Sequence, residues 1–272
     1  MNSDLSPDVR ATWQVPVFDV PLWLGQHHPY CVVIPVVNEG IRIRNLLDRM
    51  VTWKIADIAD IIIVDAGSTD GSLDLAMLQE RSVQGLLVKT GSGNLGAQLR
   101  CAYAFALDQG YSGIVTIDGN DKDDPEAIPQ FIDALKDGFD FVQASRFIPG
   151  GIAENTPKLR SFAIRWIHVP MLSLFSGFRW TDTTQGFRAY SRTMLLDTSV
   201  APFRDIFLSY ELLAYLSYRA PKLGYWCIEL PTRRRYPSTG EIPTKISNIK
   251  GILSLLQVLF RSCLGVYNPT TK

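Results

Sequence analysis

Four short apolar runs, each followed by a segment with helical character, constrain the fold of this chain more than any other feature. The runs are rich in β-branched residues and span positions 31–37, 61–64, 85–89 and 114–117. We expect helices after them, at positions 41–53, 73–81, 97–107 and 125–135. Short buried strands that alternate with helices form βαβ units with parallel strands. The sequence therefore predicts an α/β protein with a mostly parallel sheet flanked by helices.

The chain outside this alternation divides into three parts. Positions 1–29 contain scattered prolines, so we expect an irregular N-terminal arm with at most one short strand near 15–20. The main domain is expected over 30–237. Positions 238–272 are expected to hold the end of a basic loop and a C-terminal amphipathic helix. Within the main domain, segments 140–145 and 224–230 predict further strands, and Glu211 is expected to open an amphipathic helix.

Two apolar runs in the second half, 166–178 and 251–264, are shorter than the roughly 18 to 20 residues that span a bilayer. Each fits either a buried helix or a helix that lies on a membrane surface. No secretory signal is expected, because the N-terminus lacks a basic segment followed by an apolar core. We therefore predict a cytoplasmic protein, peripheral at the inner membrane face if these runs meet lipid.

Composition excludes some classes of partner and site. The 27 basic and 27 acidic residues give a formal net charge of +0, so no overall field attracts nucleic acid. The cysteines Cys31, Cys101, Cys227 and Cys263 are far apart and show no paired spacing. Reduced buried thiols are therefore expected rather than disulfides or a metal site. The pattern gives no indication of the oligomeric state.

Polar residues end three of the predicted strands. Asn38 and Glu39 follow the first, Asp65 follows the second and Asp118 follows the fourth. The carboxyl ends of parallel strands line the crevice where ligands bind in open α/β sheets, so these residues predict a nucleotide-sized site. Carboxylates there can hold a hard cation that in turn holds phosphates.

The residues after Asp118 have a simpler interpretation. Asp123 and Asp124 could cap the following helix, with Pro125 in its first turn and Glu126 favoured by the helix dipole. We expect this role for positions 124–126. Asp118 precedes the cap on a Gly-Asn turn, so we expect a functional role for it.

Two basic segments predict anion binding. Arg146 ends the strand at 140–145 beside a Gly-Gly loop, which suits a phosphate clamp, although a surface arginine on a turn would look the same. Arg233, Arg234, Arg235 and Tyr236 precede an apolar segment, so this loop fits an anionic group at a membrane face, or else a solvated charge run. The Gly-rich loop at 91–96 follows the third strand rather than the first, which argues against a dinucleotide site.

The ordered set of motifs resembles the family 2 glycosyltransferases with the GT-A fold, and among them the polyprenyl (dolichyl)-phosphate mannose synthase-like branch. The matching segments are VVIPVVNEG (32–40), IIIVDAGSTDGS (61–72), GNLGAQLRCAYAFA (93–106), IVTIDGNDKDDPEAI (114–128), ASRFIPGG (144–151), DTTQGFRAYSR (182–192) and GYWCIELPTRRRYP (224–237). They occur in the family's order and cover about 32–236.

The resemblance implies transfer of a sugar from a nucleoside diphosphate sugar, with inversion at the anomeric carbon. It assigns the nucleoside pocket to Pro35, Asn38, Glu39 and Asp65, the first acid of the metal motif to Asp118, and contact with phosphate to Arg146. Gln185 and Arg188 are expected near the acceptor and the reacting sugar. For a lipid-phosphate acceptor, the phosphate is assigned to Arg160, Arg233, Arg234, Arg235 and Tyr236; another cell-envelope glycan or lipid is the alternative acceptor.

The chain departs from the family at its metal motif. Asn120 replaces the second carboxylate, and Lys122 stands where a polar ligand is common in the branch. The expected cofactor is Mg²⁺ or Mn²⁺, held by Asp118 with Asn120 and a recruited Asp121 or Asp123. The alternative is that Lys122 supplies part of the positive charge itself, which leaves metal dependence open.

Charge defines the expected mechanism. A cation or an Arg/Lys clamp stabilises the departing nucleoside diphosphate, and the sugar passes through an oxocarbenium-like state. A hydroxyl acceptor needs a general base, for which Asp182 and Glu211 are the candidates, whereas a lipid phosphate needs none. His27, His28 and His168 are interpreted as structural.

Two other functions compete with this one. A sugar-1-phosphate nucleotidyltransferase would have a Gly-rich basic loop directly after the first strand, where this chain has Val36-Val37-Asn38-Glu39. A non-catalytic nucleotide-sugar-binding homologue would explain Asn120. The sequence leaves the sugar and the nucleotide unspecified.

Overall fold

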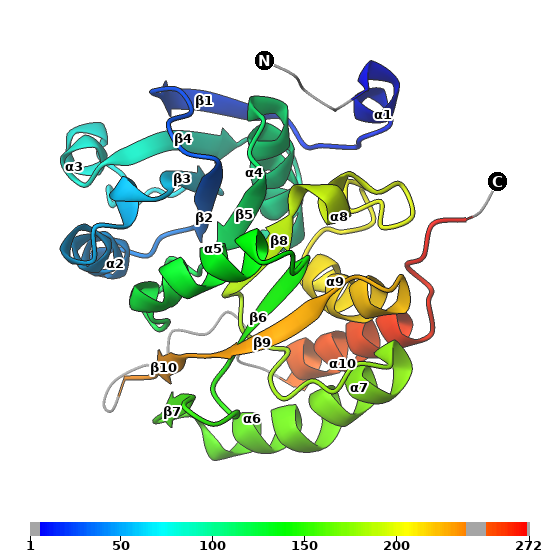
Figure 1. Ribbon diagram of the computed structural model, residues 1–272. Helices are drawn as coiled ribbons and strands as arrows, with labels where there is room; N and C mark the ends of the chain where they lie inside the picture. The colour runs from blue at the N-terminus through cyan, green and yellow to red at the C-terminus, as the bar shows by residue number, and fades with distance from the viewer. Residues whose placement is uncertain (1–5, 238–248, 271–272) are drawn as a thin grey trace.

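The computed structural model describes residues 6–237 and 249–270 and has one large sheet with helices on both faces (Figure 1). The strands are β1 (Phe18–Trp23), β2 (Tyr30–Val36), β3 (Asp60–Asp65), β4 (Val83–Lys89), β5 (Gly113–Thr116), β6 (Phe141–Ser145), β7 (Ile152–Glu154), β8 (Arg188–Ser191), β9 (Cys227–Pro231) and β10 (Arg233–Arg235). The α-helices are α1 (Pro7–Ala11), α2 (Ile41–Thr52), α3 (Leu75–Glu80), α4 (Leu95–Gln109), α5 (Ile128–Lys136), α6 (Lys158–Ala163), α7 (Val169–Ser176), α8 (Arg192–Leu196), α9 (Glu211–Lys222) and α10 (Ile249–Cys263). Short 3-10 turns lie at Ile55–Asp57 and Pro125–Ala127, and a π-helical turn lies at Ile164–His168.

The main sheet has the strand order β1-β4-β3-β2-β5-β8-β6-β9. Strands β4, β3, β2 and β5 run parallel to their neighbours, and β9 runs parallel to β6. Strand β8 is antiparallel to both β5 and β6, and β1 is antiparallel to β4. This mixed but mostly parallel sheet confirms the predicted α/β class.

The N-terminal arm is more regular than expected. It contains α1 and supplies β1, which pairs along β4 at the edge of the sheet. Most of β1 is exposed or partly exposed. An edge strand with little burial lacks a strong apolar alternation, and this explains why the sequence indicated little more than a possible strand here.

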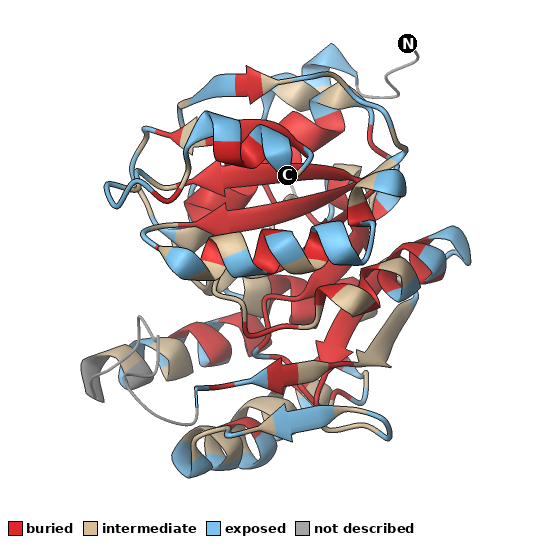
Figure 2. Ribbon diagram, turned by 90° about the vertical axis from the view of Figure 1, so that its left-hand side faces the viewer, coloured by how far each residue is buried: buried red, intermediate tan, exposed pale blue. Residues whose placement is uncertain are grey.

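Successive residues of the central strands point into two separate cores. In β2, Val32 and Ile34 face the side covered by α2 and α5, whereas Cys31 and Val33 face the side of α4. All of these residues are buried, as expected for a strand covered on both faces. Figure 2 shows the buried central strands between helices whose outer faces are exposed.

The order of the strands changes direction at the neighbouring parallel strands β2 and β5. From β2 the chain builds β3 and then β4 on one side, and it returns to place β5 on the other side of β2. This reversal of direction is the switch point at which open α/β sheets bind ligands. The approach of β5 to β2 is close, because a Cβ on Gly119 would lie 2.9 Å from Cγ2 of Val36 and 3.1 Å from the Pro35 carbonyl oxygen.

Both apolar runs of the second half form helices. The run at 166–178 continues α6 through the π turn into α7, and α10 contacts α7 and α9. Val258, Leu259 and Cys263 are buried, so one face of α10 packs on the core, while Leu253 and Phe260 are exposed. Within 6–237 and 249–270, no helix is long and apolar enough to cross a membrane. The part of the basic loop expected at 238–248 lies outside the described residues.

Candidate active site

The ends of β2 and β3 form one side of the crevice. Asp65 is buried, and its carboxylate accepts hydrogen bonds from the Ser68 amide at 2.9 Å and the Ser68 hydroxyl at 2.6 Å. The exposed Asn38 accepts a hydrogen bond from the Thr69 amide at 2.8 Å. Pro35 is buried in β2 next to these turns. The structure therefore brings Pro35, Asn38 and Asp65 close together. Asn38 and Asp65 bind neighbouring residues, Thr69 and Ser68, of the loop after β3.

Glu39 faces in another direction. Its carboxylate lies 2.7 Å from Arg42 Nη2 in the first turn of α2, and the residue is 8% exposed. Sequence reasoning missed the residue that joins the two strand ends, which is Gln98 of α4. Its amide nitrogen donates to the Val36 carbonyl at 2.8 Å and to the Val64 carbonyl. Gln98 thus holds the carboxyl ends of β2 and β3 together, just before the loops that carry Asn38 and Ser68.

Asp118 follows β5 at the centre of the crevice. Its Oδ2 accepts a hydrogen bond from Arg234 Nη2 at 3.2 Å and lies 3.5 Å from the amide nitrogen of Asn120. Its Oδ1 packs against the backbone of Gly186, where a Cβ would overlap it. The Asp118 side chain is 21% exposed, whereas Arg234 is nearly buried at 7%. Asp118 is therefore an accessible carboxylate held by a buried guanidinium.

The remaining acids of this segment serve other partners. Arg49 of α2 binds Asp121 at 3.0 Å, Asp124 at 3.2 Å and Glu126 at 2.7 Å. Asp124 is the N-cap residue of the Pro125–Ala127 turn, with Pro125 and Glu126 in the first turn as predicted, but its side chain makes no capping hydrogen bond. The reason is a long-range partner, because an arginine competes better for these carboxylates than a backbone amide.

Asp123 is buried and forms a two-armed ion pair with Arg234, at 2.6 Å and 2.5 Å. The carbonyl oxygen of Asn120 accepts a hydrogen bond from the Lys122 amide at 3.3 Å. Of the predicted ligands, Asp118 and Asp121 have side chains that are 21% and 20% exposed, and each contacts one arginine, Arg234 and Arg49 respectively. A cation bound there would share these two carboxylates with guanidinium groups. The expected recruitment of Asp123 is not supported, because both of its oxygens contact Arg234.

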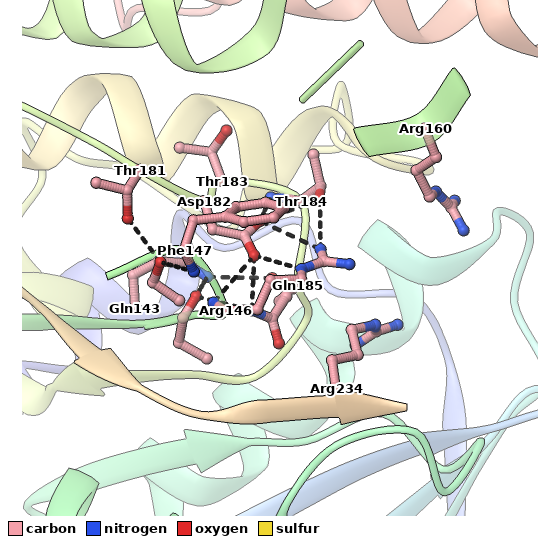
Figure 3. Close-up of polar contacts among 12 residues, drawn as sticks. Gln143, Arg146, Phe147, Arg160, Thr181, Asp182, Thr183, Thr184, Gln185 and Arg234 are labelled. Atoms are coloured by element: carbon pink, nitrogen blue, oxygen red, sulfur yellow. Dashed lines mark hydrogen bonds and ion pairs between the residues drawn. The ribbon is translucent and has the colours of Figure 1, made fainter. Parts of the chain in front are cut away.

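Arg146, at the end of β6, is buried at 3% exposure rather than on a surface turn. Its Nε lies 2.6 Å from Asp182 Oδ2, and its Nη2 donates to Thr184 Oγ1 at 3.1 Å (Figure 3). Burial alone would raise the pKa of Asp182, but Arg146 and the hydrogen bonds from Gln185 and Thr184 hold it below its ordinary value. An ion-paired carboxylate of lowered pKa is a poor base, so the suggested role of Asp182 as a general base is corrected.

Two further predicted residues have structural positions. Arg188 is 1% exposed and donates to the carbonyl oxygens of Thr183, Gln185 and Leu213, which makes it a support for the 183–185 loop rather than a direct substrate contact. Glu211 accepts from the Ser209 amide at the start of α9, so this candidate base is occupied as well. Neither partner could be read from the sequence, because both depend on the packing of distant elements.

Several buried polar atoms in this part of the molecule have no partner among the described residues. They are Arg146 Nη1, Thr183 Oγ1, Gln185 Oε1, Thr232 Oγ1 and Arg234 Nε. Each belongs to a residue that is at most 6% exposed. Buried polar groups are rarely left unpaired without a reason, and a bound ligand would satisfy them. This concentration marks the region between β6, β10 and the 181–185 loop as a binding site.

Cations surround Tyr236. Arg160 Nη1 donates to its hydroxyl at 3.1 Å, and Lys122 Nζ lies 5.2 Å from its ring centroid. The guanidinium of Arg234 lies 5.9 Å from the same ring. Figure 3 shows Arg160 and Arg234 on the same side of the Arg146 and Asp182 contacts. By contrast, Arg233 and Arg235 pair with Glu154 and have side chains that are 42% and 61% exposed, so these two arginines lie outside this cluster.

Burial and these neighbouring charges shift the pKa values of Lys122 and Tyr236. Burial lowers the pKa of Lys122 to about 8, helped by the neighbouring Arg234. Burial alone would raise the pKa of Tyr236, but Arg234, Arg160 and Arg146 together lower it to about 8. A positive field strong enough to favour a buried phenolate also favours a phosphate.

The field at Tyr236 predicts a spectroscopic result. Between pH 7 and pH 9, the wild-type protein should gain one tyrosinate with an apparent pKa of about 8, and Tyr236→Phe should lose this absorbance change. Arg160→Gln should move the pKa upward, because it removes a cation that stabilises the phenolate. Arg235→Gln is the matched control, since Arg235 pairs with Glu154 instead. A wild-type titration that matches Tyr236→Phe would contradict the arrangement.

Sequence reasoning also missed Glu229 of β9 and Gly186. Glu229 accepts from the amides of Thr181 and Asp182, each at 2.9 Å, and so holds the loop that carries Asp182. Gly186 provides the space for Asp118. The sequence shows Glu229 only as a charged residue within the predicted strand 224–230. It does not show that this carboxylate binds the loop at 181–182.

Comparison with known proteins agrees with this geometry. The sequence model described as Glycosyl transferase family 2 matches residues 31–199. The polyprenol monophosphomannose synthase of Mycolicibacterium smegmatis is 28% identical over 224 residues, covering 80% of this chain and 82% of that protein. The undecaprenyl-phosphate mannosyltransferase of Micrococcus luteus is 30% identical over 202 residues, covering 73% and 80%.

Solved structures confirm the fold. Glucosyl-3-phosphoglycerate synthase from Mycobacterium tuberculosis, crystallised with Mn²⁺, UDP and glucosyl-3-phosphoglycerate, aligns with a TM-score of 0.57 at 14% identity, covering 100% of this chain and 88% of that chain. Mannosyl-3-phosphoglycerate synthase from Rubrobacter xylanophilus aligns with a TM-score of 0.54 at 15% identity, covering 86% and 72%. At these identities the likeness concerns the GT-A architecture alone.

Proposed function

We propose a specific reaction for this chain, which belongs to glycosyl transferase family 2 and has the GT-A fold. The protein is a glycosyltransferase that moves a sugar from a nucleoside diphosphate sugar to the phosphate of a polyprenyl lipid. The observation that carries the proposal is the set of buried, unpartnered donors and cations beside Asp118, including Arg146 Nη1 and Arg234 Nε. The relatives named as polyprenol- and undecaprenyl-phosphate mannosyltransferases support the lipid-phosphate acceptor.

The two substrates have separate places in this proposal. The loops of Asn38 and Asp65 hold the nucleoside, and Asp118 lies between them and the cation cluster. Arg146 and Arg160 with Tyr236 face the phosphate of the acceptor, whereas Arg234, which contacts Asp118, belongs to the donor side. Gln185 belongs to the same wall, because its Oε1 is buried and without a partner among the described residues.

The reaction needs no general base. An anionic oxygen of the acceptor phosphate donates an electron pair to the anomeric carbon. The bond from that carbon to the donor diphosphate then breaks, and its electron pair stays on the diphosphate. No proton moves, which agrees with the pairing of Asp182 to Arg146 and of Glu211 to the Ser209 amide. A single displacement of this kind inverts the anomeric configuration.

A divalent cation, Mg²⁺ or Mn²⁺, would take Asp118, Asn120 and Asp121 as ligands. Asp118 contacts Arg234, Asp121 contacts Arg49, and the Asn120 side-chain carbonyl accepts from the Lys122 amide, so each of these ligands already has a partner in the protein. No step of the proposed reaction is routed through a cation.

A membrane surface is proposed as the place of action. Leu159, Phe162 and Trp166 repeat at helical spacing on α6 and the π turn and are 71%, 56% and 71% exposed. Lys158, Arg160 and Arg165 lie on the same segment. An exposed apolar stripe flanked by basic residues is typical of a helix that lies in the interface of an anionic bilayer. Because Arg160 also contacts Tyr236, this helix would bring the lipid phosphate to the site.

Vesicle binding tests this surface. Phe162→Gln with Trp166→Gln should lower binding to vesicles of phosphatidylcholine and phosphatidylglycerol by about tenfold or more, because two large apolar side chains no longer enter the interface. Val51→Gln with Trp53→Gln is the matched control. These residues lie at the end of α2 rather than on α6, and they are 48% and 55% exposed. Equal losses for both pairs would contradict a docking role for α6.

A donor panel tests the reaction itself. UDP-sugars and GDP-sugars would each be mixed with the protein, with and without a short polyprenyl phosphate, and release of nucleoside diphosphate would be followed. We expect one donor whose turnover depends on the lipid phosphate, and a loss of about a hundredfold or more in Asp118→Asn. Pyrophosphate release from a nucleoside triphosphate would instead indicate a nucleotidyltransferase. Failure of every nucleotide to bind would indicate a non-catalytic homologue.

A further inference from the structure

We propose that Lys122 and Arg234 provide the positive charge at the donor diphosphate, so that donor binding does not depend on a divalent cation. The inference rests on the proposed function and concerns how the leaving group is stabilised. It is motivated by the chain's own departure at Asn120, together with the partners that surround Asp118. Both cationic residues are buried, at 6% and 5% exposure.

The carboxylates around Asp118 already have guanidinium partners. Both oxygens of Asp123 contact Arg234, and one oxygen of Asp121 contacts Arg49 at 3.0 Å. Asn120 contributes no charge, and its side-chain carbonyl oxygen already accepts from the Lys122 amide. A divalent cation would meet two carboxylates, Asp118 and Asp121, and would share each of them with an arginine. Magnesium and manganese sites that bind phosphates prefer carboxylate oxygens, and this site has few to offer.

Lys122 and Arg234 lie close to each other and to Asp118. Strand β10 carries Arg234, and the Arg235 amide donates to the Lys122 carbonyl at 2.8 Å, so the backbones of the two cationic residues are held together. Lys122 Nζ lies over the Tyr236 ring, and Arg234 contacts Asp118 and Asp123. A divalent cation added beside Asp118 would be repelled by both of these charges.

Arg234 has one unused hydrogen-bond donor. Its Nε is buried and has no hydrogen-bond partner among the described residues, although the other guanidinium nitrogens contact Asp123 and Asp118. A guanidinium with an unused donor matches a phosphate oxygen, and an ammonium adds a second point charge. In the group-transfer step described above, these two groups would stabilise the electron pair that the diphosphate keeps.

Calorimetric titration with UDP and GDP tests this inference without relying on turnover. For the wild-type protein, the affinity for the bound nucleoside diphosphate should differ less than about twofold between EDTA and excess Mn²⁺. Lys122→Gln should weaken the affinity in EDTA by about tenfold to a hundredfold, the effect of losing one charge-assisted hydrogen bond. Lys136→Gln is the matched control, because Lys136 pairs only with the exposed Asp133.

A second variant makes the result independent of folding defects. Asn120→Asp restores a second carboxylate near Asp118 and should introduce a stimulation of binding by Mn²⁺ that the wild-type protein lacks. Wild-type binding that requires Mn²⁺ would overturn the inference and leave the proposed function intact. Lys122→Gln with unchanged affinity in EDTA would overturn it as well. If neither nucleotide binds in any condition, the proposed function fails, and this inference fails with it.

Discussion

Asp182→Asn is expected to lower the free energy of unfolding by about 3 to 5 kcal/mol, because it leaves the buried Arg146 guanidinium without its counter-charge. Both side chains of this pair are almost completely buried, at 1% and 0% exposure, with 2.6 Å between the Arg146 nitrogen and the carboxylate. The substitution also replaces one of the two oxygens that accept from Arg146, Gln185 and Thr184 with an amide group that donates. Urea unfolding followed by circular dichroism measures the change.

The control for this result is an ion pair of the same chemistry on the surface. Asp133→Asn removes the partner of Lys136, but these side chains are 65% and 56% exposed. An exposed pair contributes about 0 to 1 kcal/mol, so the control should unfold almost as the wild-type protein does. A loss below about 1 kcal/mol for Asp182→Asn would mean that water reaches Arg146, contrary to its burial in the site.

Gly186→Ala is expected to reduce transfer by about a hundredfold, by displacing Asp118 without removing it. A Cβ at position 186 would overlap Oδ1 of Asp118, whose other oxygen is held by Arg234. The carboxylate must therefore rotate away from the crevice or the backbone must shift. We expect a smaller effect on stability, about 1 to 3 kcal/mol, which is the range for an overpacked site.

A double-mutant cycle identifies the cause. In the Asp118→Ala background the overlapping oxygen is absent, so Gly186→Ala should cost little further stability. Unfolding curves of the four proteins give the coupling free energy between the two positions. A Gly186→Ala penalty that is equal in both backgrounds would contradict the contact and would point to a requirement of the backbone instead.

The fold could be predicted because its signals are local. The runs at 31–37 and 61–64 are continuously apolar because both of their faces are buried, and each ends where the strand leaves the core. The carboxyl ends of parallel strands share one edge, so Asp65 and Asp118 could be placed at the crevice from order alone. The edge strand β1 was less visible, since few of its residues are buried.

The site could be predicted only in part, because its partners are distant in sequence. Arg49 lies 72 residues before Asp121, and no local pattern shows that it gathers the acids expected to cap a helix or bind a metal. Arg188 has the residue type of a substrate contact, but packing gives it four acceptors within the protein. The identity of charged groups is visible in the sequence, whereas their pairing is a property of the assembled fold.

A matched pair of acceptors shows whether the acceptor is a phosphate. Polyprenyl phosphate and the corresponding polyprenol would be supplied with the donor that turns over best, and mass spectrometry would identify the glycosylated lipid. We expect a glycosyl phosphate from the first acceptor and no product from the second, because the candidate bases Asp182 and Glu211 already have partners within the described residues. A glycosylated polyprenol, formed while the phosphate is ignored, would contradict this expectation.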